Sequence, residues 1–99
     1  MHYILFYDVV KGYAEKRIPF RAVHLEYAQK FVQRGELVLG GALANPADMA
    51  VLIFRGTSPA VAEDFARNDP NVKNGLVTKW HVREWTTVIG PTAEAPLPL

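Results

Sequence analysis

The chain contains no cysteine, which excludes disulfide bonds, thiolate metal sites and a cysteine nucleophile. It also lacks an excess of either charge, because 11 Lys and Arg residues stand against 10 Asp and Glu. Its pI of about 8.1 is below the value of about 9 at which an extended basic surface for nucleic acid is usual. The longest apolar runs, such as residues 50–54, are far shorter than the roughly 20 residues that span a bilayer.

Residues 1–8 lack the basic start and the small-residue cleavage site of a secretory signal peptide. We therefore expect a cytoplasmic protein whose partners include neither nucleic acid nor a membrane. The 99 residues suit one domain with one modest core. Hydrophobic residues make up 49% of the chain, so we expect it to fold rather than to remain disordered.

Periodicity and turn signals predict six elements in the order strand, helix, strand, strand, helix, strand. Pro19 is tolerated only in the first turn of a helix, and Gly35 is suited to its C-terminal cap. The predicted strands cover 2–9, 37–43, 50–55 and 78–89; the helices cover 14–34 or 18–34 and 59–68. This order predicts an α+β fold with a split βαβ pattern, in which both helices cover one face of a four-stranded antiparallel sheet.

The predicted sheet has apolar residues on both faces, although two helices can cover only one. In the first strand Tyr3, Leu5 and Tyr7 point one way, while Ile4 and Phe6 point the other. Large exposed apolar patches usually mark contact surfaces. We therefore predict a homodimer in which the uncovered sheet faces pack together. The alternative is that the C-terminal tail folds over this face, but its few large apolar residues are inadequate for that.

Two polar residues of the first helix fall on its apolar side. At 100° per residue Leu25 and Val32 belong to a broad apolar arc, with His24 near its middle and Arg21 within it. Arg17 would also lie in this arc if the helix already runs through that position. Asp69 continues the inner face of the second helix. The positions of His24 and Asp69 each have an explanation without any function. His24 could bond a backbone group in the core, and Asp69 could cap a short turn that begins at Pro70.

The split βαβ topology brings these residues to one place. With strand order 4-1-3-2 the two helices run in opposite directions, so the first starts where the second ends. His24 and Asp69 therefore meet, although they are 45 positions apart, and Arg21 lies nearby. Gly40 and Gly41 reach the same end, where the missing side chains let a ligand approach the backbone. This end of the molecule is thus a candidate acid–base pocket.

The order and spacing of several short motifs resemble the YCII-related (YciI-like) family over roughly residues 2–89. They are Arg21-x-x-His24-Leu25-x-Tyr27, Gly35-x-Leu37, Gly40-Gly41, Ser58-Pro59, Asp69-Pro70, Gly75-Leu76 and Trp80-x-Val82. The resemblance implies a ferredoxin-like, dimeric α+β barrel over residues 1–89. Three prolines and the absence of periodicity from Gly90 onward predict an extended tail at 90–99. The resemblance also implies that His24 and Asp69 match the suspected catalytic pair of the family. Asn71 and Ala42 depart from the family pattern and would reshape the pocket wall.

The leading hypothesis is an enzyme that needs no cofactor, because a histidine side chain can itself transfer protons. An ordinary imidazole, with a pKa of about 6.5, takes up and releases a proton at cellular pH. His24 would be the general acid–base, Asp69 would orient it, and Arg21 would bind an anionic oxygen. The expected chemistry is that of a lyase, an isomerase or a dehydrochlorinase acting on a small anionic or aromatic molecule.

Two alternatives stay open: a dimer that binds a small ligand without catalysis, and a polar cluster that only stabilises the dimer. No metal site is expected, since His2, His24 and His81 lack the spacing of metal ligands.

Overall fold

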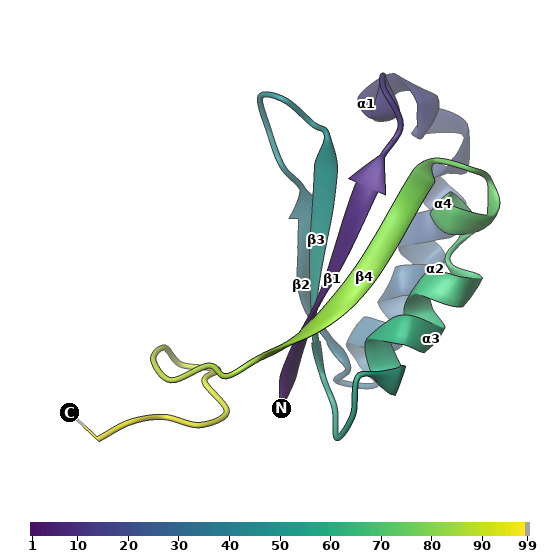
Figure 1. Ribbon diagram of the computed structural model, residues 1–99. Coiled ribbons are helices and arrows are strands. Elements are labelled where there is room, and N and C mark those ends of the chain that lie inside the picture. Colours follow the sequence, from purple (N-terminus) through teal and green to yellow (C-terminus); the bar gives the residue numbers. More distant parts are fainter. Residues whose placement is uncertain (99) are drawn as a thin grey trace.

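A four-stranded antiparallel sheet lies against a layer of helices in the computed structural model, which describes residues 1–98 (Figure 1). The strands are β1 (His2–Val9), β2 (Leu37–Ala42), β3 (Met49–Arg55) and β4 (Val77–Trp85). Their order across the sheet is β2-β3-β1-β4 and all neighbours are antiparallel. The α+β fold and the strand order 4-1-3-2 predicted from the sequence are therefore confirmed.

The predicted first helix is divided into three pieces. These are α1 (Tyr13–Lys16), a 3-10 turn η1 (Ile18–Phe20) and α2 (Arg21–Gln33). Pro19 lies in the first turn of this 3-10 segment, where a proline is tolerated because its missing N–H would have no helical partner there. Gly35 follows α2 with a φ of +75°, the left-handed conformation expected of a helix cap. No helix within residues 1–98 combines the length and apolar character needed to cross a membrane.

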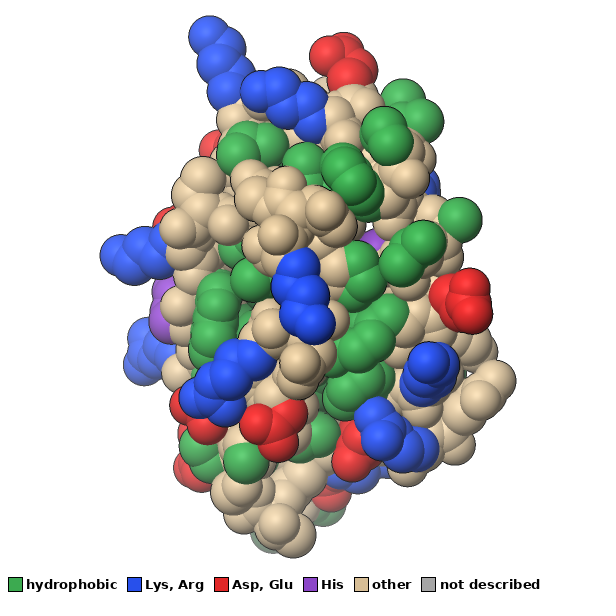
Figure 2. Space-filling model, turned by 90° about the vertical axis from the view of Figure 1, so that its right-hand side faces the viewer, with side chains coloured by type: hydrophobic (Ala, Val, Ile, Leu, Met, Phe, Trp, Pro, Cys, Tyr) green, Lys and Arg blue, Asp and Glu red, His purple; other side chains and the backbone are tan. Residues whose placement is uncertain are grey.

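The second helical segment is α3 (Ala60–Asn68), followed by the single turn α4 (Pro70–Lys73). It buries Ala62, Phe65 and Ala66 against the sheet. Figure 2 views the helical side and shows hydrophobic side chains running between charged ones. A groove between α2 and α3 is lined in part by Tyr27 and Val61.

The core lies between the sheet and the helices and follows the alternation of the strands. Tyr3, Leu5 and Tyr7 of β1 pair with Phe54, Leu52 and Ala50 of β3, and all six are buried. The rings of Phe54, Phe65 and Phe31 lie within 6.4 Å of one another and fill the end of the core below α2. Ile4 and Phe6 point to the other face and are only half-buried, as their alternation predicts.

The packing of α2 differs from the prediction of a broad apolar face. Only Ala28 of α2 is buried, while Leu25 is 49% exposed and Val32 is 44% exposed. The helical wheel placed both residues in the apolar arc, but it could not show that β2 leaves this edge of α2 uncovered. Leu25 and Val32 instead line a cavity between α2 and the sheet.

The last strand is shorter than predicted, since β4 ends at Trp85 rather than at Ile89. The chain then turns back on itself, because the Ala95 N–H donates to the Thr87 carbonyl and the Leu97 N–H to that of Val88. Glu94 accepts a hydrogen bond from Arg55 of β3, and this contact lowers the pKa of Glu94. The tail is thus attached to one end of the sheet rather than freely extended; Leu99, the last residue of the predicted tail, lies outside the described residues.

Candidate functional site

Asp69 links α3 to α4 and its side chain is completely buried. Its extended backbone ends α3, and Pro70 begins α4 directly after it. The Asp69 Oδ1 atom accepts a hydrogen bond of 3.0 Å from the Asn71 N–H, so the side chain does cap this turn. A buried carboxylate needs more than one partner, because burial removes its hydration. The further partners come from two other elements.

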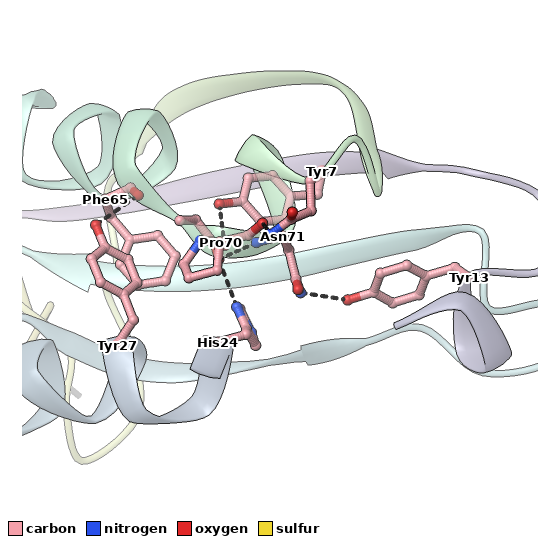
Figure 3. Close-up of polar contacts among 9 residues, drawn as sticks. Tyr7, Tyr13, His24, Tyr27, Phe65, Pro70 and Asn71 are labelled. Atoms are coloured by element: carbon pink, nitrogen blue, oxygen red, sulfur yellow. Dashed lines mark hydrogen bonds and ion pairs between the residues drawn. The ribbon is translucent and has the colours of Figure 1, made fainter. Parts of the chain in front are cut away.

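His24 reaches Asp69 from the first turn of α2 (Figure 3). The distance from His24 Nδ1 to Asp69 Oδ1 is 2.7 Å, and the imidazole is 15% exposed. An ionised carboxylate can only accept hydrogen bonds, so Nδ1 carries the hydrogen and donates it. In the neutral imidazole the other ring nitrogen, Nε2, then keeps its lone pair. Nε2 makes no hydrogen bond to the described residues, and His24 lines the cavity.

Tyr7, near the end of β1, is the third partner of Asp69. Its hydroxyl donates a hydrogen bond of 2.7 Å to Asp69 Oδ2. Burial, and next the negative charge of Asp69, raise the pKa of Tyr7, so the phenol keeps its proton. The sequence analysis did not select Tyr7 for this role. Its inward-facing strand position was visible, but the partner of its hydroxyl could not be seen without the geometry of the α3–α4 turn.

The cavity next to His24 has a volume of about 490 Å³ and lies between α2 and the neighbouring strands β2 and β3. Small residues on the helix-facing side of the sheet create the space, namely Gly40, Ala42 and Ala50. A Cβ atom at Gly40 would lie 3.2 Å from Leu52 Cγ, a tight contact that a larger side chain would worsen. The structure thus brings the five predicted site residues together. The cavity is lined by His24, Arg21, Gly40 and Gly41. Asp69 does not line it, but contacts the His24 ring through Nδ1.

Comparison with known proteins supplies the family. The model of the YCII-related domain matches residues 1–86. The chain belongs to the YCII-related family. No curated protein matches it.

Two solved structures share the fold of this YCII-related chain. One is 5-chloro-2-hydroxyhydroquinone dehydrochlorinase from Burkholderia phenoliruptrix AC1100, in complex with 2,5-dihydroxybenzoquinone, with a TM-score of 0.73 and 23% identity over 88% of this chain and 95% of that chain. The other is protein Atu4242 from Agrobacterium tumefaciens, with a TM-score of 0.56 and 21% identity over 95% of this chain and 98% of that chain. At these identities the likeness establishes the shared fold.

Two further residues of this YCII-related site come from the segment before α2. Tyr13 of α1 and Arg17 both line the cavity, and the Arg17 guanidinium lies 5.3 Å from the centre of the Tyr13 ring. Tyr13 is anchored by Asn71, whose Nδ2 donates to the Tyr13 hydroxyl over 3.3 Å (Figure 3). The sequence analysis considered Arg17 only on condition that the helix already ran through it, and it did not single out Tyr13.

The other two histidines lie away from the site. His2 Nδ1 is 2.7 Å from Thr87 Oγ1 at the end of the sheet, and His81 stacks on Phe6 on the uncovered sheet face. The three histidines therefore do not converge on one metal site. Within residues 1–98 no group of three or more His, Cys, Asp or Glu side chains is arranged to hold a metal ion.

Proposed function

We propose that this YCII-related protein is a cofactor-free enzyme that transfers protons on a small anionic or aromatic molecule. The observation that carries this proposal is the 2.7 Å contact between His24 Nδ1 and Asp69 Oδ1, beside a cavity that His24 lines. An imidazole held in this way has a fixed tautomer, and its second nitrogen is available to a ligand. Asp69 orients the ring and stabilises the positive charge that develops on it.

In the proposed reaction, His24 Nε2 accepts a proton from the bound molecule, and the electron pair of the broken bond stays on that molecule. Arg21, which lines the same cavity, binds the oxygen on which negative charge develops. In an isomerisation the proton returns to a different carbon of the same molecule. In a lyase or dehydrochlorinase reaction the electron pair forms a double bond and expels a leaving group, such as chloride, with its bonding electrons. No electrons are transferred to or from the protein, so the chemistry requires no redox cofactor.

Dehydrochlorination is supported by the structural neighbour that is named a dehydrochlorinase and binds 2,5-dihydroxybenzoquinone. At 23% identity this neighbour suggests compounds to test and does not fix the substrate. We further propose that the enzyme is a cytoplasmic homodimer that packs through the uncovered sheet face.

The test compares the wild-type protein with His24→Gln and Asp69→Asn on 5-chloro-2-hydroxyhydroquinone and on a panel of small hydroxylated and carbonyl-containing rings. Chloride release and deuterium incorporation from D₂O, followed by NMR, report elimination and proton exchange. We expect the wild type to alter at least one compound and His24→Gln to slow that reaction by about 100-fold or more, the usual contribution of a general acid–base. His81→Gln is the matched control and should keep the wild-type rate, because His81 lies on the other sheet face. A His24→Gln variant that is folded and fully active would contradict the proposal.

The second candidate function is a dimer that binds a small ligand without altering it, and the cavity of about 490 Å³ alone would serve that role. Thermal-shift screening followed by analysis of the recovered ligand separates the two. A compound that binds and is always recovered unchanged would favour the binding protein.

A further inference from the structure

The ionisable side chains that line the cavity are either basic or neutral phenols. They are Arg17, Arg21, His24, Tyr7 and Tyr13, and no Asp or Glu is among the lining residues. Asp69 contacts His24 from behind and has no exposed surface. A ligand in the cavity therefore meets positive charge that no lining carboxylate balances.

The two cavity arginines also differ from the arginines elsewhere that have acidic partners. Arg34, Arg55 and Arg67 each form an ion pair, with Glu36, Glu94 and Asp64. Within residues 1–98 no carboxylate oxygen lies within 4.0 Å of a guanidinium nitrogen of Arg17 or Arg21. A guanidinium presents paired N–H groups that match the two oxygens of a carboxylate. Both arginines are thus available for an anionic group of the ligand.

Arg17 is held in place by neighbouring side chains. It lies over the ring of Tyr13, which is 5% exposed and fixed by the hydrogen bond from Asn71. Because the Tyr13 oxygen accepts that bond, its own hydrogen remains free, and no other residue in the described part of the chain accepts it. The Tyr13 hydroxyl can therefore donate to the same anionic group that Arg17 binds.

The opposite part of the cavity is apolar. Arg21, Leu25, Ala28 and Val32 follow one face of α2, and the helix rises about 16 Å between the first and the last of them. On the helix-facing side of the sheet, the buried Leu37 of β2 and Leu52 of β3 also line the cavity. The cavity thus changes from cationic, near the start of α2, to apolar toward its end.

From this gradient we infer that the cavity selects a small molecule that carries a carboxylate on an apolar ring. Arg17 and Arg21 bind the carboxylate, Tyr13 donates a hydrogen bond to it, and Leu25, Val32 and Leu37 contact the ring. Tyr13 and Arg17 are thereby binding residues in addition to Arg21. The inference rests on the proposed function, since it names the substrate class of the same site.

The test is calorimetric titration of the full chain with benzoate, its uncharged analogue benzamide, and acetate, which lacks the ring. We expect benzoate to bind at least about tenfold more tightly than benzamide and than acetate, since hydrogen bonds to a charged group contribute this much. Equal affinities for benzoate and benzamide would overturn the inference.

Arg17→Gln and Arg21→Gln should each weaken benzoate binding by about tenfold and leave benzamide binding unchanged. Arg83→Gln is the matched control, because Arg83 is exposed and does not line the cavity. An equal loss in Arg83→Gln would show a general effect of charge and would overturn the inference. If Arg17→Gln does not fold, Arg21→Gln alone tests the inference, because Arg21 is exposed and its replacement leaves the core unchanged.

The titrations, read beside the activity assays of the wild type, separate this inference from the proposed function. A wild-type protein that prefers benzoate but alters no compound supports the binding mode and contradicts the enzymatic proposal. Turnover that depends on His24, without any preference for the carboxylate, contradicts the binding mode and leaves the enzymatic proposal intact.

Discussion

Asp69 is the residue on which the arrangement of the site depends. Its two oxygens accept hydrogen bonds from Tyr7, His24 and the Asn71 backbone, which come from three parts of the chain. A carboxylate without exposed surface is stable only with such partners, because an uncompensated buried charge costs several kcal/mol. The same bonds that stabilise Asp69 therefore fix the position of His24.

Tyr7→Phe should reduce stability by an amount that depends on pH. Near neutral pH the loss of a hydrogen bond to a buried charge should lower the free energy of unfolding by about 1.5–3 kcal/mol. Because folding raises the pKa of Tyr7 above the ordinary value of about 10 for a phenol, the stabilising contribution of Tyr7 is complete below that pH and is progressively lost above it. The free energy of unfolding of the wild type should thus fall by up to about 1.4 kcal/mol per pH unit for this proton, and Tyr7→Phe should lack this part of the decrease.

Urea unfolding at several pH values between neutrality and about pH 12 measures this difference. Tyr3→Phe is the control at neutral pH, because Tyr3 occupies the same face of β1 and its hydroxyl makes no hydrogen bond to residues 1–98. Its effect should be much smaller than that of Tyr7→Phe. A stability difference between wild type and Tyr7→Phe that stays constant into the alkaline range would contradict the role given to Tyr7.

At the scale of the elements, the sequence predicted what periodicity and caps determine. The β1 alternation, the glycine after α2 and the start of α4 at Pro70 are all local signals, and each is found where it was expected. The exposure of Leu25 and Val32 was not predictable from the helical wheel, because it depends on how far α2 stands from β2. The end of β4 at Trp85 was also missed, since residues 86–89 are all β-branched, as is typical of strands, but Thr87 and Val88 accept hydrogen bonds from the tail.

The candidate site was predictable only in part, because element order follows from the sequence whereas most side-chain directions do not. Element order alone brought the start of α2 to the end of α3, and so predicted that His24 and Asp69 meet. The hydroxyl groups of Tyr7 and Tyr13 reach the site through side-chain directions that no sequence pattern specifies. Asn71 was noted only as a departure from the family, whereas its amide anchors Tyr13.

For the whole molecule, the uncovered sheet face is the main unexplained surface. It presents the half-buried Ile4, Phe6 and Ile53 next to the more exposed Trp85. Charged residues of β4, Lys79 and Arg83, border this apolar area. We predict that a second copy of the chain covers it.

Light scattering coupled to size-exclusion chromatography should give the wild type twice the chain mass of 11.1 kDa. Phe6→Asp, which places a charge in this face, should give the mass of one chain. Val23→Asp is the control, since Val23 is an exposed apolar residue of α2 in the helical layer, and should leave the dimer intact. A wild-type protein with the mass of one chain would show that the prediction is wrong.

The central claim is that Asp69 fixes the proton of His24 on Nδ1 and leaves Nε2 free toward the cavity. Nitrogen-15 NMR of the histidine rings, recorded over a range of pH, measures this directly. We expect His24 to carry its hydrogen on Nδ1 in the wild type and to lose this single tautomer in Asp69→Ala. A wild-type His24 with its hydrogen on Nε2 would contradict the account, because its free lone pair would then face Asp69 instead of a ligand.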